Sequence, residues 1–227
     1  MHVISEPMTE SEQVDCPYFL HASIQLYAMV QHLNTTCIHA PDAVAPMYSG
    51  NMEMICTSHP AICTYLSPLD AVMGSRTLVR SDDRFRPIDF RQVDTRHFME
   101  RHGRLSVAVN YAYGATSGRL VVSDVGHPLM TYTFASFDVP VEHRDHFTIH
   151  FPGSVVERIE TAYLRAGLSG FSKTLDMMDA WTADQITDAE AEALANKPPT
   201  IAVEGAKIDQ YAIYDPETAD WVFTNFD

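Results

Sequence analysis

The sequence predicts an α+β protein in which an antiparallel β-meander packs with N-terminal and C-terminal helices, and a β-hairpin closes the chain. Residues 105–113 alternate between large apolar and smaller side chains without a break, which is the period of a β-strand. Three more short strands are expected at 120–123, 130–135 and 147–151. The short connections between these consecutive strands favour antiparallel pairing.

The N-terminal part is expected to begin with a helix from Pro17 to about Leu33. Asp15 or Cys16 is placed to cap this helix, and Pro17 suits its first turn because the N–H that proline lacks has no intrahelical partner there. Apolar residues then recur at helical spacing until Asn34. Prolines break the segment that follows, so we expect it to be irregular, with a short helix near 60–66 or 68–74.

Helices and strands alternate in the remainder of the chain. A helix from about Asp94 to His102 is expected, capped by Asp94 and ended by Gly103. Ser154 and Glu157 have the spacing of a capping box at the start of a helix after the meander. The last expected elements are a helix at about 173–181, a helix opened by Thr182–Gln185 and ended at Asn196–Pro199, and strands at 200–204, 208–214 and 221–224.

Length and composition indicate one globular domain over residues 1–227. Of these 227 residues 46% are apolar and 20% are charged, which is typical of a folded chain with a sizeable core. We expect an uncharged or acidic N-terminal region at 1–75, and a core of sheet and helices at 105–227. No motif resembles a known family over a useful length.

The charges are segregated along the chain, and this restricts the classes of partner. The net charge is −15, and residues 1–75 contain acids but no Lys or Arg before Arg76. A segment without cations cannot bind nucleic acid or anionic lipid through its side chains, which argues against both as partners of this region. Eight arginines follow at 76–104 among five acids, so we expect ion pairs within the chain or between subunits; an anionic ligand or nucleic acid is the alternative, and the small net charge of this window disfavours it.

One constellation satisfies the needs of a thiol nucleophile. Cys16 is expected at the start of a helix, where the dipole favours the thiolate. His127 stands before a predicted strand and Asp138 after it, as base and orienting acid. The order resembles that of papain-like hydrolases, although the local motifs around their cysteine are absent. The alternative is a small buried Cys16 and a loop histidine.

A second constellation could hold zinc. Five Cys and His residues lie within 27 residues, where zinc requires four N or S ligands. Their spacing matches no standard zinc ribbon or finger, and burial of the cysteines as apolar residues is the alternative. The candidate ligands are Cys37, His39, Cys56, His59 and Cys63.

The function predicted first is that of a non-enzymatic subunit or adaptor of a protein assembly. Between residues 16 and 69 the only formal charges are Asp42 and Glu53, so this region must be buried in the fold or covered by a partner or a second copy of the chain. The alternatives are the Cys16 hydrolase or transferase, a zinc-stabilised module, and an acidic mimic of DNA. No signal-peptide pattern or membrane span is recognisable, so a cytoplasmic location is expected.

Overall fold

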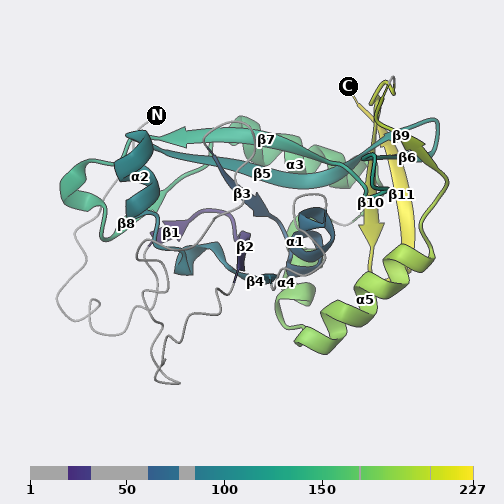
Figure 1. Ribbon diagram of the computed structural model, residues 1–227, viewed down its shortest axis with the longest axis horizontal. Coiled ribbons are helices and arrows are strands. Elements are labelled where there is room, and N and C mark those ends of the chain that lie inside the picture. The colour runs from purple at the N-terminus through teal and green to yellow at the C-terminus, as the bar shows by residue number, and fades with distance from the viewer. Residues whose placement is uncertain (1–19, 32–60, 77–84, 169, 205, 227) are drawn as a thin grey trace.

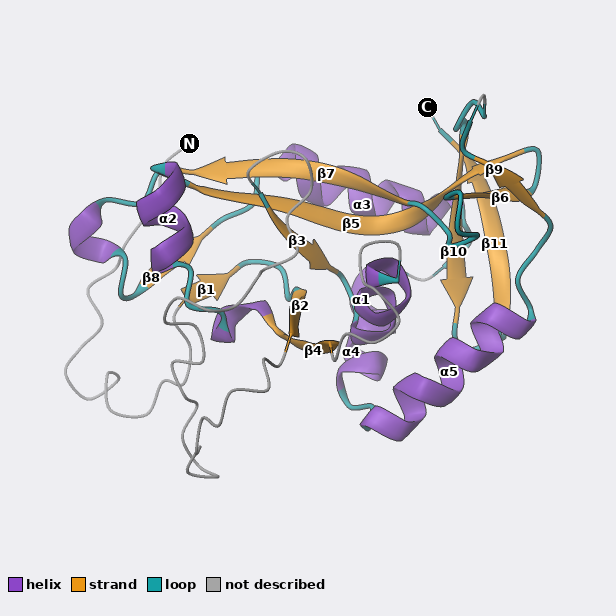
Figure 2. Ribbon diagram, viewed as in Figure 1, coloured by secondary structure: helices purple, strands orange, loops and turns teal. Residues whose placement is uncertain are grey.

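The computed structural model describes residues 20–31, 61–76, 85–168, 170–204 and 206–226, and it confirms the α+β class (Figures 1 and 2). One hydrophobic core cluster joins buried residues from Leu20 to Tyr214. Figure 2 shows most strands gathered into one sheet, with helices around it.

The long strand β5 (Leu105–Thr116) is the centre of this sheet, and all its residues except Thr116 are buried. Along one side it pairs antiparallel with β7 (Met130–Phe137) and β6 (Arg119–Val122). Along the other side it pairs parallel with β3 (Ile62–Tyr65) and antiparallel with β10 (Gln210–Asp215). The first three strands of the predicted meander therefore form as β5, β6 and β7, with β6 and β7 both paired to β5.

The outer strands extend the sheet in both directions. On the β3 side come β2 (Tyr27–Gln31) and then β4 (Phe85–Asp89), while β10 pairs with β11 (Asp220–Asn225) in the predicted C-terminal hairpin. The short β9 (Thr200–Ala202) pairs parallel with β6. The last predicted meander strand, β8 (Phe147–Ile149), leaves this sheet and pairs parallel with β1 (Leu20–Ala22).

Five α-helices lie in the described parts of the chain. They are α1 (Pro68–Ser75), α2 (Arg96–His102), α3 (Gly153–Arg165), α4 (Phe171–Asp179) and α5 (Ala183–Ala195), with short 3₁₀ turns at Phe90–Gln92 and Val141–His143. In Figure 1, α1, α4 and α5 gather below β5. The indole N–H of Trp221 donates to the carbonyl of Ala193 at 3.0 Å and so ties α5 to β11.

The predicted N-terminal helix is wrong within the described residues, because residues 20–22 and 27–31 form β1 and β2. The physical reason is tertiary pairing. β2 lies between β3 and β4, which supply hydrogen-bond partners on both of its sides. Leu26–Met29 are consecutively buried, so the helical spacing of the apolar residues was coincidental. Residues 62–65 are likewise a strand, whereas the alternative short helix at 68–74 is confirmed as α1.

The helix caps agree with the sequence at α5 but not at α3. Thr182 and Gln185 form the predicted capping box at the start of α5. The box predicted at Ser154 is wrong, because α3 begins at Gly153 with Pro152 as its N-cap, and the carbonyl of Pro152 accepts from the N–H groups of Val155 and Val156. At α2 the N-cap is Thr95 in place of the predicted Asp94, and Gly103 ends the helix at a φ of 77° as predicted.

Candidate functional site

The structure does not bring together His127 and Asp138, the predicted base and orienting acid of the thiol nucleophile. Cys16, the predicted nucleophile, lies outside the described residues. His127 precedes β7 and Asp138 follows it. A strand of eight residues spans about 25 Å, too far for the acid to orient the imidazole. The backbone of His127 instead closes the β6–β7 turn, exchanging hydrogen bonds with the backbone and hydroxyl of Ser123.

The predicted zinc ligands fall almost entirely outside the described residues. Only Cys63 is placed, in β3, where it is 3% exposed and packs with Tyr27, Met29 and Tyr65. Within the described ranges no group of three His, Cys, Asp or Glu side chains could hold a metal ion. Zinc binding by Cys37, His39, Cys56, His59 and Cys63 stays a prediction.

The arginine window makes ion pairs within the chain, as predicted. Arg76 pairs with Glu190 of α5, and Arg91 pairs with Asp89. Arg96 bridges two acids, Asp94 at 2.6 Å and Asp145 at 2.9 Å. These pairs join α1 to α5 and stabilise the turns around α2.

The described parts of the charge-poor region are packed within the protein's own core. Leu20, Leu26, Ala61 and Leu66 are at most 1% exposed. Burial in the fold therefore explains the absence of charge in residues 20–29 and 61–69. A surface for a partner has to be sought where this region reaches solvent.

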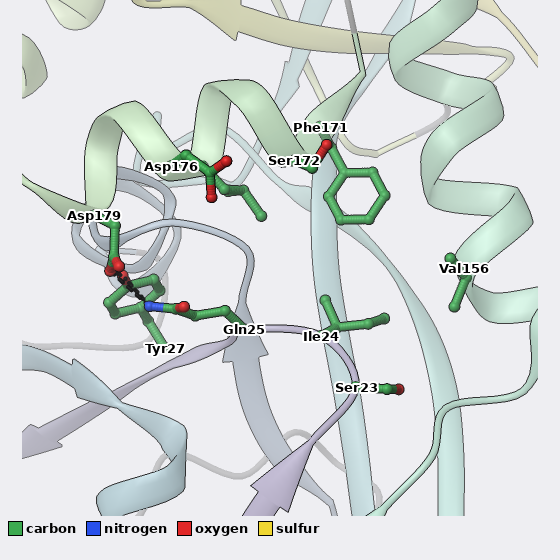
Figure 3. Close-up of a pocket in the computed structure, with 10 residues that line it drawn as sticks. Ser23, Ile24, Gln25, Tyr27, Val156, Phe171, Ser172, Asp176 and Asp179 are labelled. Atoms are coloured by element: carbon green, nitrogen blue, oxygen red, sulfur yellow. Dashed lines mark hydrogen bonds between the residues drawn. The ribbon is translucent and has the colours of Figure 1, made fainter.

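Such a place is a pocket between the β1–β2 loop and α4, with a volume of about 220 Å³ (Figure 3). The N-terminal region supplies one wall and the C-terminal helices supply the other. The lining residues are Ser23, Ile24, Gln25, Tyr27, Val156, Phe171, Ser172, Leu175, Asp176 and Asp179.

Apolar side chains form the base of the pocket. Ile24 and Leu175 are 5% and 8% exposed, and Phe171 stands opposite Ile24 in Figure 3. The loop that carries Ile24 is anchored by Ser23, whose N–H donates to the carbonyl of Ile149 and whose hydroxyl accepts from the N–H of Phe151. This anchoring holds the apolar base in place because both bonds lead to the β8 segment.

The polar rim is built around Asp179, near the end of α4. Its carboxylate accepts hydrogen bonds from the Gln25 amide at 2.6 Å and from the Tyr27 hydroxyl. The same Gln25 amide also donates to the Tyr27 oxygen at 3.1 Å. Burial and the bond to Asp179 raise the pKa of Tyr27, so its hydroxyl keeps its proton at neutral pH. The three side chains thus form a fixed network at the mouth.

A second carboxylate lies beside this network. Asp176 precedes Asp179 by three residues on α4, a spacing that places both on one side of the helix, and both residues are exposed. The ten described residues that line the pocket include no Lys, Arg or His. A pocket with an apolar base and an anionic rim is suited to a cation on an apolar stem.

Few features of the sequence indicate this pocket. Gln25 lies within the predicted N-terminal helix, which does not form, and Asp176 and Asp179 share helical spacing with many solvent-exposed acids. The only local signal is that pair of carboxylates on a predicted helix. The contact with Gln25 and Tyr27 joins residues more than 150 positions apart, which no spacing rule anticipates.

No protein-family model, curated protein or solved structure matches this chain. Among the helices in the described ranges, none has the length and apolar character needed to cross a lipid bilayer. The function therefore has to be inferred from the site itself.

Proposed function

We propose that the protein is a non-enzymatic subunit or adaptor that binds a protein partner, and that its pocket receives a Lys or Arg side chain of that partner. The observation that supports this is the apolar base beneath the carboxylates of Asp176 and Asp179. Lys and Arg bury an aliphatic stem while their cationic heads stay near water or acids. The charge-poor N-terminal region takes part through Ile24, Gln25 and Tyr27.

The size of the pocket favours a side chain over a drug-sized free ligand. Its volume of about 220 Å³ is below the roughly 300–1,000 Å³ common for drug-sized small molecules. A single long side chain that projects from a larger partner needs less space. The remainder of the binding energy would come from the surface around the mouth.

The exposed surface of α4, which borders the pocket, and of α5, the next helix along the chain, is acidic. Along α4 and α5 the exposed acids far outnumber the one base, Lys173; they are Asp176, Asp179, Asp184, Asp188 and Glu192. An acidic face attracts a basic partner and accelerates its association. A second copy of a chain with net charge −15 would meet like charge there, so a different, basic protein is favoured over self-association through this face.

We expect Asp176→Asn to weaken binding of an arginine-containing peptide about fivefold, because a charge-assisted contact at an exposed rim contributes about 1 kcal/mol. The probe is a short labelled peptide with one Arg among Gly, Ser and Leu, measured by fluorescence anisotropy. Its counterpart carries citrulline, which retains the shape of Arg and removes the charge. Asp176 is chosen because it is exposed, so the substitution should leave the fold intact.

The matched control is Asp188→Asn, because Asp188 is also an exposed acid, lies on α5 and does not line the pocket. It should change the affinity less than twofold. Equal binding of the citrulline peptide would contradict the proposal. So would an equal loss in Asp176→Asn and Asp188→Asn, since that result would mean general attraction by the acidic face.

A further inference from the structure

We propose that a second pocket, between α3 and β10, binds the phosphate group of a small phosphate monoester. The pocket has a volume of about 260 Å³. Its lining residues are Ser154, Glu157, Arg158, Thr161, Ala162 and Arg165 of α3 and Tyr211 of β10. This inference is independent of the partner-binding pocket and shares no lining residue with it.

The helix presents its hydrogen-bond donors on one side. Ser154, Arg158, Thr161 and Arg165 are spaced by four, three and four residues, which aligns them along one face of α3. The rotation of the helix is set by the buried residues of its other side, which include Ile159 at 0% exposure. Packing of the core therefore turns the face of α3 that carries these donors toward the pocket.

The opposite wall offers a hydroxyl in a fixed position. The hydroxyl of Tyr111 donates to the hydroxyl oxygen of Tyr211 at 2.8 Å. Because Tyr211 is the acceptor in this bond, the proton of its hydroxyl is not used there and can be donated to another group. Ring contacts hold Tyr211 between Tyr111 and Phe226, at centroid distances of 5.5 Å and 4.2 Å. Tyr211 can thus donate to a ligand without losing its place.

Arg158 lies close to this tyrosine pair. Burial and the bond to Tyr211 raise the pKa of Tyr111, and the positive charge of Arg158 acts in the opposite direction. This effect of Arg158 on the pKa of Tyr111 requires the two residues to be close, and it agrees with the presence of Arg158 and Tyr211 in the lining of one pocket. The two groups can therefore contact one bound anion together.

The chemistry of the lining favours phosphate over a carboxylate. Two guanidinium groups, two aliphatic hydroxyls and one phenol supply more donors than the two oxygens of a carboxylate can use. The three terminal oxygens of a phosphate monoester accept from several donors at once. One acid, Glu157, also lines the pocket, so the cationic excess comes from Arg158 and Arg165 in a chain that is otherwise acidic.

The test is a titration of the full chain with glycerol 3-phosphate, in which amide ¹H–¹⁵N chemical shifts are recorded by NMR at each ligand concentration. We expect saturable shifts in α3 and β10, and no such shifts with glycerol or acetate. Arg158→Gln should weaken binding about tenfold, and Tyr211→Phe should weaken it about threefold because the ring stays packed. The same spectra report whether each variant is folded.

Arg119→Gln is the matched control, because Arg119 is an exposed arginine of β6 that does not line the pocket. It should leave the affinity within twofold. The proposal would be overturned by no saturation at ligand concentrations on the order of 10 mM, by equal binding of acetate, or by an equal loss in Arg119→Gln and Arg158→Gln. Inorganic phosphate, titrated in parallel, should bind at the same residues, and shifts confined to other residues would also overturn it.

Discussion

Replacing Arg76 with alanine is expected to lower the free energy of unfolding by about 2–3 kcal/mol. Arg76 donates from Nε and Nη2 to the two carboxylate oxygens of Glu190, at 2.5 Å and 2.9 Å. The Glu190 side chain is only 8% exposed, whereas that of Arg76 is 50% exposed. Truncation of the arginine leaves a buried carboxylate without its cation, and the partial exposure of Arg76 places the loss below that of a fully buried pair.

Urea unfolding of Arg76→Ala, Glu190→Gln and the double variant measures this interaction as a double-mutant cycle. The double variant should be more stable than Arg76→Ala, because glutamine at position 190 removes the negative charge that truncation of Arg76 leaves buried and unpaired. Arg101→Ala, at an exposed position of α2, is the control and should change stability by less than about 0.5 kcal/mol. A change in Arg76→Ala as small as in this control would show that the α1–α5 contact does not depend on the ion pair.

Local pattern was sufficient to predict the meander and the C-terminal helices. The alternation over 105–113 corresponds to β5, and the Thr182–Gln185 box opens α5, because both signals arise within a few residues. The hairpin of β10 and β11 follows from the turn residues at 215–218 for the same reason. Such elements need no knowledge of the remainder of the chain.

Elements stabilised by distant partners were missed. β3 consists of four buried residues and pairs parallel with β5, more than 40 positions away in the sequence. A short strand that is buried along its whole length has no period by which it could be distinguished from part of a helix. The same holds for β2, whose pairing with β3 and β4 overrides a helical spacing of apolar residues.

The candidate site was less predictable than the fold, because its chemistry depends on side chains that are distant in the sequence and are brought into contact only by folding. The sequence displays Asp176 and Asp179 as two acids of a helix, and Gln25 and Tyr27 as parts of an apolar segment. Only the packing of α4 against the β1–β2 loop turns them into one rim over an apolar base. The Arg158 pocket likewise depends on Tyr211, which comes from a strand more than 50 residues later.

The second large effect expected is that the ionisation of Asp70 lowers the free energy of unfolding as the pH rises from about 4 to about 6. The Asp70 carboxylate in the first turn of α1 accepts from the Ser67 hydroxyl at 2.8 Å and from the Tyr113 hydroxyl at 3.2 Å. Burial nevertheless raises the pKa of Asp70 to about 6, because desolvation outweighs these two bonds. The position at the start of a helix also favours the anion, but by only about 0.3–1 kcal/mol.

The sign follows from proton binding. In the unfolded chain the carboxyl titrates near its ordinary pKa of 3.8, so between that value and about 6 the native state holds more protons than the unfolded state. Stability therefore falls across this window, and the full loss is present above it. A difference of about two pKa units corresponds to about 3 kcal/mol; since part of the residue remains accessible to solvent, we expect about 1–2 kcal/mol.

Asp70→Asn separates this ionisation from the hydrogen bonds that surround it. The amide can accept from one of the Ser67 and Tyr113 hydroxyls and donate to the other, and it carries no charge at any pH. The variant should be more stable than the parent above about pH 6, and its stability should change less between about pH 4 and 7 when followed by urea unfolding. Asp188→Asn, at an exposed site on α5, should retain the pH dependence of the parent. An unchanged slope in Asp70→Asn would mean that Asp70 ionises in the native state as readily as in the unfolded chain, and that the helix dipole and the two hydroxyls together offset its burial.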